Sequence, residues 1–518
     1  MVIATKLSCC WIILSNVKQI PKRPNSIKNQ SDFRFGKLDL KIQNGPIFEN
    51  IKSNMTVEQI YTGCLAQGAY YIRSGNEAAI IDPLREVGPY LERAERDGVK
   101  IKYVLETHFH ADFVSGHLDL AKKSGAKIVY GPEARPDFEA HIAKDGEFLK
   151  LGDVQIKVLH TPGHTMESTC YLLSDENGKD HSIFTGDTLF LGDVGRPDLA
   201  QKAATMTMED LAGLLYESLQ EKIMPLADDI VVYPGHGAGS ACGKNMMKET
   251  VDNLGRQKEL NYALRQADKE SFIKEVTNGL LPPPGYFGMN VALNKAGYES
   301  FDQVLSRGMK ALSPEAFELL ANTDETIILD TRPAEDFCKG FVPRSVNIGL
   351  KGDFAPWVGA LFVDVKQSIL LVCRPGEEEE TITRLSRIGF DHVLGYLEGG
   401  FESWSKEIDT VQRISTAEFE ARFHAGECLV IDVRKESEYS TLHVETAINQ
   451  PLNEINNWSG KDISEKGPVF IHCAGGYRSM IAASILKARG FHDFIEVEGG
   501  FNAIAKTGVP MEKELKPA

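Results

Sequence analysis

Two histidines and an aspartate alternate in the stretch Glu106-Thr107-His108-Phe109-His110-Ala111-Asp112-Phe113, which follows the apolar-rich run of residues 101–105. Where a strand runs out into a loop, alternate side chains lie on one side of the backbone, so these three side chains can converge. Imidazole and carboxylate groups are common protein ligands of metal ions. The stretch therefore predicts a strand that ends at a metal site.

Three further glycine-containing turns carry one candidate ligand each. They read Thr161-Pro162-Gly163-His164, Phe184-Thr185-Gly186-Asp187 and Tyr233-Pro234-Gly235-His236-Gly237. A strand-like run precedes each turn, at residues 154–159, 182–184 and 230–233. Four such turns in this order indicate one metal centre far more strongly than a single His-x-His pair does.

This order of motifs resembles that of the metallo-β-lactamase-fold proteins, over about residues 55–300. The resemblance implies an αββα fold. The family's usual first motif is His-x-His-x-Asp-His, and Phe113 stands here in its last place. In two-metal members the sixth residue is a ligand of the second metal ion. Because a phenylalanine cannot coordinate a metal, the resemblance implies that the second site is impaired.

The three ligands that remain, His108, His164 and Asp187, form a 2-His-1-carboxylate set with open positions, which suits Fe(II) and O2 chemistry. The whole segment, including residues 195–198 (Gly-Arg-Pro-Asp), resembles the persulfide dioxygenase branch, whose members carry one iron per chain on these ligands. The resemblance makes the same three residues the iron ligands. It gives three others the task of orienting the ligands through hydrogen bonds: His110, Asp112 and His236.

Two residues near these turns are candidates for handling the substrate. Cys242 lies six residues after His236. It is open to two interpretations, either a small residue in a tight turn or a thiol at the mouth of the iron site. Arg196 flanks the metal turns and could bind a carboxylate of a glutathione-like substrate.

The C-terminal portion contains one pattern twice, at an offset of about one hundred residues. Residues 328–332 recur at 430–434, and residues 397–401 recur at 497–501. In each copy β-rich runs alternate with helical stretches, which is typical of an α/β unit with a mainly parallel sheet. We therefore expect two domains, at residues 311–411 and 413–512, followed by a tail at 513–518. Residues 280–313 are the expected connection to the first domain.

The second copy carries Cys473 at the end of a strand, before a glycine-containing loop and a helix start. Backbone N–H groups and a helix N-terminus would surround the sulfur there and stabilise a thiolate or a bound anion. The loop resembles the active loop of the rhodaneses, and residues 432–434 match the family's other signature. The resemblance makes Cys473 the nucleophile that accepts a sulfane sulfur, cradled by Ala474, Gly475, Gly476, Tyr477 and Arg478.

The first copy lacks this equipment. Its loop places Arg374 opposite Cys473 and Glu379 opposite Arg478. Glutamates there would repel thiosulfate. Cys373 comes one residue early, where a strand side chain points the other way, and is predicted to be a buried structural residue. We expect this domain to be inactive and to pack against its partners.

Length, charge and cysteine usage limit the remaining possibilities. A chain of 518 residues is long enough for three domains. The net charge of −16 argues against nucleic acid, and no apolar run approaches a membrane span. The nine cysteines have neither zinc-type nor disulfide-type spacing, which favours a reducing cytoplasm. Residues 1–54 are basic, and a disordered extension before a natural start at Met55 is favoured over a targeting peptide.

The resemblances together cover nearly all of residues 55–512 and imply a persulfide dioxygenase–rhodanese fusion. Such a protein oxidises glutathione persulfide with O2 to sulfite and glutathione at one Fe(II) per chain, and passes sulfane sulfur between thiosulfate and glutathione. We also expect a homo-oligomer. Two alternatives stay open: a glyoxalase II-like thioester hydrolase with two metal ions fused to a sulfur-carrier rhodanese, and a non-catalytic sulfur carrier or sensor with a vestigial metal domain.

Overall fold

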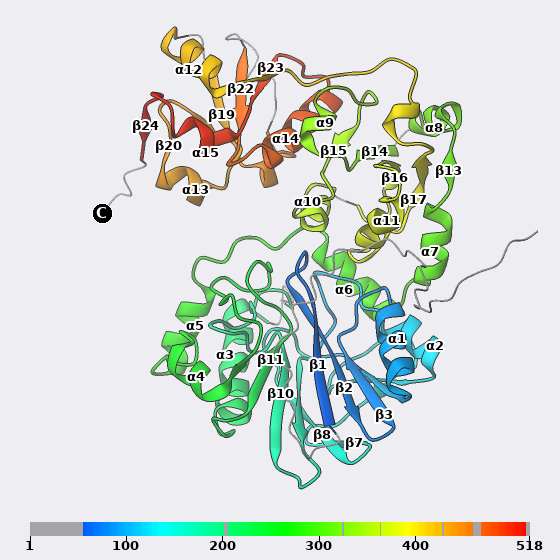
Figure 1. The fold of residues 1–518 in the computed structure, drawn as a ribbon. Helices are drawn as coiled ribbons and strands as arrows, with labels where there is room; N and C mark the ends of the chain where they lie inside the picture. Colours follow the sequence, from blue (N-terminus) through cyan, green and yellow to red (C-terminus); the bar gives the residue numbers. More distant parts are fainter. Residues whose placement is uncertain are drawn as a thin grey trace, which may run out of the picture. The chain divides into compact units, whose positions relative to one another are not determined.

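The computed structural model describes residues 55–200, 206–323, 326–362, 364–426, 429–458 and 468–513. The expectations for residues 1–54 and for the end of the tail lie outside these ranges. Figure 1 shows the described elements and their labels. Among the described residues, no helix is long and apolar enough to cross a bilayer.

Two six-stranded sheets form the first region of the chain. The first sheet has the order β1 (Met55–Thr62), β2 (Gln67–Ser74), β3 (Glu77–Ile81), β4 (Lys100–Leu105), β5 (Lys127–Tyr130), β6 (His141–Ile142). The second has the order β12 (Asp252–Asn253), β11 (Val231–Pro234), β10 (Asp180–Gly186), β9 (Thr169–Ser174), β8 (Val154–His160), β7 (Phe148–Leu151). The strand runs predicted before each metal turn are therefore present as β4, β8, β10 and β11.

The two sheets pack face to face and carry helices on their outer faces (Figure 1). In β9, Tyr171 and Leu173 pack against the first sheet, whereas Leu172 packs against helices, as the two-residue period of a strand requires. The helices on the first sheet are α1 (Gly88–Asp97) and α2 (His117–Ser124). Those on the second are α3 (Met208–Ser218), the π-helix η1 (Leu219–Ile223), α4 (Leu254–Leu260) and α5 (Lys269–Thr277). This arrangement confirms the predicted αββα fold.

The expected connection contains two helices, α6 (Phe287–Ala296) and α7 (Phe301–Gly308). Beyond it lie two five-stranded sheets with the same strand order, and every neighbouring pair in them is parallel. The first is β13 (Ala311–Leu312), β17 (Val393–Leu397), β16 (Ser368–Val372), β14 (Thr326–Asp330), β15 (Val346–Asn347). The second is β18 (Arg413–Ile414), β23 (Phe494–Val497), β22 (Val469–His472), β19 (Leu429–Asp432), β21 (Ile448–Asn449). The predicted repeat of parallel α/β units is confirmed.

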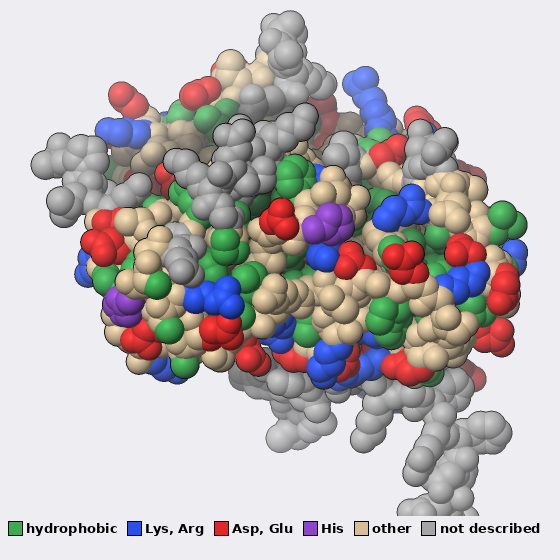
Figure 2. Space-filling view, turned by 90° about the horizontal axis from the view of Figure 1, so that it is seen from above, with side chains coloured by type: hydrophobic (Ala, Val, Ile, Leu, Met, Phe, Trp, Pro, Cys, Tyr) green, Lys and Arg blue, Asp and Glu red, His purple; other side chains and the backbone are tan. Residues whose placement is uncertain are grey.

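Each repeat also carries its own set of helices. The first has α8 (Pro314–Ala321), α9 (Ala334–Phe337), α10 (Phe354–Leu361), α11 (Glu378–Ser386) and the 3-10 turn η2 (Phe401–Ser403). The second has α12 (Thr416–His424), α13 (Glu436–Thr441), η3 (Leu452–Glu454), α14 (Tyr477–Ala488) and α15 (Gly500–Ile504), with a small antiparallel pair β20 (His443–Val444) and β24 (Met511–Glu512). On the face that Figure 2 shows, acidic and basic side chains are interspersed.

The recurring sequence patterns have the same structural task in both repeats. Arg332 forms a buried ion pair with Asp330, at 2.6 Å, and lies 4.0 Å from the ring centroid of Phe401. In the second repeat Arg434 pairs with Asp432 at 2.6 Å and lies 3.7 Å from the Phe501 ring. The Asp-x-Arg pattern thus ties the end of one strand to the turn that follows another.

Candidate active sites

Three ligand-type side chains meet where β4, β8 and β10 end. Suitable atoms of His108, His164 and Asp187 all lie within 4.8 Å of one another, and all three residues are buried. Asp187 Oδ2 lies 3.9 Å from His108 Nε2 and 3.5 Å from His164 Nε2. Among the described residues this oxygen has no hydrogen-bond partner. A buried acceptor that faces two imidazole nitrogens fits a bound cation.

Hydrogen bonds fix which nitrogen each histidine offers. His164 Nδ1 lies 2.9 Å from the carbonyl oxygen of Arg196, so Nδ1 carries the proton and Nε2 is free. The Thr107 hydroxyl donates to Asp82 and lies 3.0 Å from His108 Nδ1, which must therefore donate to it. Both free Nε2 atoms face Asp187. This is the tautomer that metal ligation requires.

Close backbone approach brings these side chains together. Gly186 has a φ of +49°, and a Cβ there would lie 2.5 Å from Thr107 Oγ1. A residue with a side chain would push β10 away from the loop that carries His108. The glycine before Asp187 therefore fits the close approach of the two sheets.

His236 lies between two carboxylates. Its Nδ1 is 2.8 Å from Asp187 Oδ1, and its Nε2 is 2.7 Å from Asp112 Oδ2. Burial opposes its protonation, but the two carboxylates outweigh burial and raise the pKa of His236 well above its usual range. Burial likewise opposes ionisation of Asp187, but His236, His108 and His164 hold its pKa well below the usual range. In this arrangement His236 donates from both nitrogens and orients Asp187.

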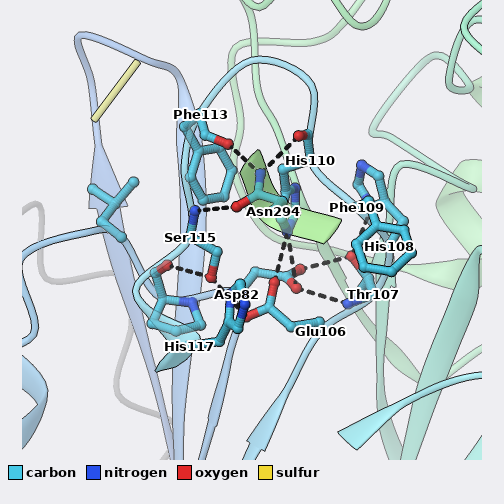
Figure 3. A network of polar contacts seen from close by, with 12 residues as sticks. Asp82, Glu106, Thr107, His108, Phe109, His110, Phe113, Ser115, His117 and Asn294 are labelled. Carbon is cyan, nitrogen blue, oxygen red and sulfur yellow. Dashed lines mark hydrogen bonds and ion pairs between the residues drawn. The ribbon is translucent and has the colours of Figure 1, made fainter. Parts of the chain in front are cut away.

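His110 belongs to a second buried network, shown in Figure 3. Its Nε2 lies 3.1 Å from Asp82 Oδ1 and 3.6 Å from Glu106 Oε2, so the ring faces away from Asp187. Burial and Asp82 raise the pKa of Glu106 well above its usual range. The Asn294 amide of α6 donates to the carbonyl oxygens of His110 and Phe113 at 2.8 and 2.7 Å. These contacts hold residues 110–113 in one conformation.

Asp82, Glu106 and Asn294 were missed by the sequence analysis. Asp82 and Glu106 directly follow β3 and β4, and a charged residue next to an apolar strand is a signal that could have found them. Asn294 offers no such signal, because it lies in a helix of the connecting segment.

Phe113 fills the place that the family motif gives to a histidine. It is fully buried, and its ring lies 4.2 Å from that of His110 and 6.5 Å from that of His236. Cys242 lies beside the same group: one ligand-type atom each of Asp112, His236 and Cys242 fall within 4.8 Å. Burial and the charge of Asp112 raise the pKa of the Cys242 thiol. The structure therefore places Cys242 at the metal residues.

Arg196 is engaged within the chain. Its guanidinium pairs with Asp198 at 2.6 and 2.7 Å and donates to the carbonyl oxygens of Ala241 and Leu281. Its own N–H donates to the carbonyl of Cys242. Arg196 thus holds His164 and the Cys242 turn in place, and its use as a substrate ligand stays a prediction.

The second repeat presents Cys473 at the end of β22. Its sulfur accepts a hydrogen bond from the N–H of Gly476 at 3.1 Å, and its side chain is 1% exposed. The Ser479 hydroxyl lies 3.5 Å from the sulfur and donates to Glu496 at 2.7 Å. Gly476 has a φ of +105° and directly precedes α14. The expected cradle of strand end, glycine loop and helix start is therefore present.

Arg478 is not a lone positive charge in this cradle. It pairs with Glu438 of α13 through two bonds, at 2.6 and 2.8 Å. In the first repeat Asp336 holds Arg374 at 2.6 Å. There Cys373 is buried, and burial and Glu378 raise the pKa of its thiol. The two loops therefore differ in charge as the sequence predicted, apart from the pairing of Arg478.

Comparison with known proteins covers all three regions. Residues 62–236 match the family described as Metallo-beta-lactamase superfamily, and residues 313–407 and 415–507 each match the Rhodanese-like domain. The chain is 30% identical over 217 residues to a probable hydroxyacylglutathione hydrolase of Schizosaccharomyces pombe, covering 38% of this chain and 80% of that protein. It is 30% identical over 225 residues to the mitochondrial persulfide dioxygenase ETHE1 of Homo sapiens, covering 43% and 80%.

A solved structure extends this likeness. The crystal structure of a metallo-beta-lactamase from Staphylococcus aureus has 31% sequence identity and a TM-score of 0.59, and covers 66% of this chain and 98% of that one. The chain therefore belongs to the metallo-beta-lactamase superfamily, and it carries two rhodanese-like domains after the metal domain. Relatives of both names occur, so the comparisons do not choose between dioxygenase and hydrolase.

Proposed function

We propose that the chain is a persulfide dioxygenase that also transfers sulfane sulfur. The observation that carries the proposal is the single 2-His-1-carboxylate set of His108, His164 and Asp187, next to a phenylalanine at the position of a second-metal ligand. A structural zinc site would need a fourth protein ligand, whereas this set leaves positions open. Iron, one per chain, fits this donor set.

The residues of the chain prepare the site for this chemistry. Thr107 and the Arg196 carbonyl fix the histidine tautomers, and His236 orients Asp187. Fe(II), when bound, supplies open coordination positions at which O2 and a sulfur substrate react. The reaction consumes glutathione persulfide, O2 and water, and yields glutathione, sulfite and two protons. Phe113 keeps a second metal ion and its bound water from the site.

The second activity belongs to Cys473. Its thiolate attacks the outer sulfur of thiosulfate, the S–S bond breaks, and sulfite leaves with the electron pair of that bond. A thiolate such as glutathione then takes the outer sulfur from the Cys473 persulfide and restores the cysteine. Glutathione persulfide is a substrate of one site and a product of the other, so joining the two sites raises its effective concentration.

Metal content and O2 uptake test the proposal. Protein prepared anaerobically should hold about one iron per chain and consume O2 when given glutathione persulfide. Asp187→Ala should lose both iron and O2 uptake but keep sulfur transfer from thiosulfate. Asp153→Ala, at an exposed aspartate of the same domain, should change neither. If Asp187→Ala loses both activities while still folded, the two-site proposal is wrong.

One observation favours a hydrolase as the second candidate. Asp112, His236 and Cys242 offer three ligand atoms close together, so the thiol could take the place of the imidazole that Phe113 lacks. Two zinc ions per chain, with hydrolysis of a glutathione thioester, would support this candidate and contradict the dioxygenase. A cytoplasmic location and assembly as a homo-oligomer stay predictions.

A further inference from the structure

The active loop of the second repeat contacts the first repeat through Tyr477. The Tyr477 hydroxyl donates to the carbonyl oxygen of Gly349 at 2.8 Å, in the loop that follows β15. A Cβ at Gly352 would lie 2.9 Å from Cζ of the Tyr477 ring, and one at Gly349 would lie 3.3 Å from Cε2. Two glycines of the first repeat therefore leave the room that the ring occupies. We call residues 349–352 the receiving loop.

The receiving loop is held from within the first repeat. Arg384 of α11 is buried, and its guanidinium donates to the carbonyl oxygens of Leu350 at 2.6 Å and Gly352 at 3.2 Å. Burial and the nearby Asp353 raise the pKa of Tyr477, so the phenol keeps the proton that it donates. The receiving loop is thus a fixed acceptor.

A second bond fastens the same helix. The N–H of Asn347, at the end of β15, donates to the Ser484 hydroxyl at 2.9 Å. Ser484 lies seven residues after Tyr477 in α14, so both residues lie on one face of the helix, two turns apart. The first repeat therefore holds α14 at two points along its length (Figure 1).

The beginning of α14 is also the wall of the Cys473 cradle. The N–H of Gly476, next to Tyr477, donates to the Cys473 sulfur. A shift of Tyr477 would therefore move the donor that faces the reacting sulfur. Displacements of about 1 Å at a reacting group can cost large factors in rate.

We propose that the first repeat positions the active loop of the second, with Tyr477 as a positioning residue for sulfur transfer at Cys473. The inference rests on the sulfur transfer proposed above. It gives the first repeat, which has an arginine in place of the reactive cysteine, a task in the reaction of its neighbour.

Gly352→Ala tests this from the other domain. The added methyl group should displace the Tyr477 ring and lower kcat for transfer from thiosulfate about tenfold, with KM within about twofold. Dioxygenation of glutathione persulfide should be unchanged. Gly376→Ala is the matched control, because it adds a methyl group to another glycine of the first repeat, with a φ of +91° and nothing within 4 Å of the added carbon. It should keep full transfer.

A double variant separates positioning from general damage. In a Tyr477→Ala background the ring is gone, so adding Gly352→Ala should change kcat by less than about twofold. Tyr477→Phe keeps the ring but loses the hydrogen bond, and should slow formation of the Cys473 persulfide, followed by mass spectrometry, about threefold. This variant also serves if Gly352→Ala does not fold.

Two results would overturn the inference alone: normal transfer in Gly352→Ala, or, if that variant does not fold, normal persulfide formation in Tyr477→Phe. An equal loss from Gly352→Ala with and without the Tyr477 ring would do the same. A wild-type protein that transfers no sulfur from thiosulfate would instead remove the proposed function, and the inference with it.

Discussion

The His236 imidazole donates to Asp187 from one nitrogen and to Asp112 from the other, so no lone pair remains for a metal ion. Its effect on a bound metal therefore passes through Asp187. Loss of such an outer hydrogen bond typically lowers metal affinity by about 10–100-fold, whereas loss of a ligand removes the site.

His236→Ala should accordingly weaken Fe(II) binding by about 10–100-fold and leave a measurable site. Anaerobic titration against a competing chelator gives the affinity. His141→Ala, at a histidine that pairs with Glu147 away from the metal residues, is the control and should bind iron normally. Complete loss of iron in His236→Ala would mean that His236 is itself a ligand.

The two cysteines at corresponding strand ends should differ in chemistry. Cys473 faces an N–H donor, whereas the Cys373 thiol is buried and its pKa is raised. Cys473→Ser should eliminate transfer from thiosulfate, because an alcohol cannot form the persulfide. Cys373→Ser should keep both activities. Mass spectrometry after exposure to thiosulfate should find the added sulfur on Cys473, and finding it on Cys373 would reverse the assignment.

Sequence patterns could indicate the metal residues because each lies in a short motif of its own. His164 and Asp187 follow a glycine within a turn, so their local surroundings identify them. Asn294 and the receiving loop could not be found in this way. Their importance depends on which distant segment they contact, and that contact exists only once the chain has folded.

Among the elements, the turn from β22 to α14 depends on one backbone conformation. Gly476 has a φ of +105°, where an L side chain costs about 1–3 kcal/mol, and its N–H faces the Cys473 sulfur. The strand, the turn and the helix could be predicted from the sequence. The two helices of the connection were not, because the prolines at 282–284 mark only where the previous helix must end.

Gly476→Ala should therefore lower sulfur transfer by about tenfold or more, since the N–H donor would turn away from the sulfur. The activity is measured with thiosulfate, and stability by thermal unfolding. Gly426→Ala is the control: this glycine of the second repeat has a φ of +75° and nothing within 4 Å of an added Cβ. It should lose similar stability but keep transfer. Equal activity in both variants would contradict the role of the turn.

In the molecule as a whole, buried charges join the first repeat to the metal domain. Arg85 is fully buried, pairs with Asp391 at 2.9 Å, and donates to the carbonyl oxygens of Glu299 and Ser386. The N–H of Val114, in the loop after Phe113, donates to the carbonyl oxygen of Arg387 at 2.6 Å. The sequence analysis could not find these pairs, because the partners lie about three hundred residues apart.

Arg85→Leu should destabilise the protein by about 3–5 kcal/mol, because it leaves Asp391 buried without its partner. Burial already raises the pKa of Asp391, and Arg85 opposes that rise. Without Arg85 the carboxyl of the folded protein takes up a proton more readily than that of the unfolded chain. Its folded-state pKa then lies higher still, so the loss of stability should grow as pH rises through that pKa and shrink below about pH 5.

Urea unfolding at pH 5 and pH 7 measures this dependence. The double variant Arg85→Leu/Asp391→Leu should regain much of the lost stability and show little of the pH dependence, since no charge is left unpaired. Lys179→Ala removes an exposed ion pair with Asp229 and should leave the unfolding midpoint unchanged. If Arg85→Leu unfolds at the wild-type midpoint, the two domains do not depend on this pair. If its deficit is the same at both pH values, Asp391 is not the group left unpaired.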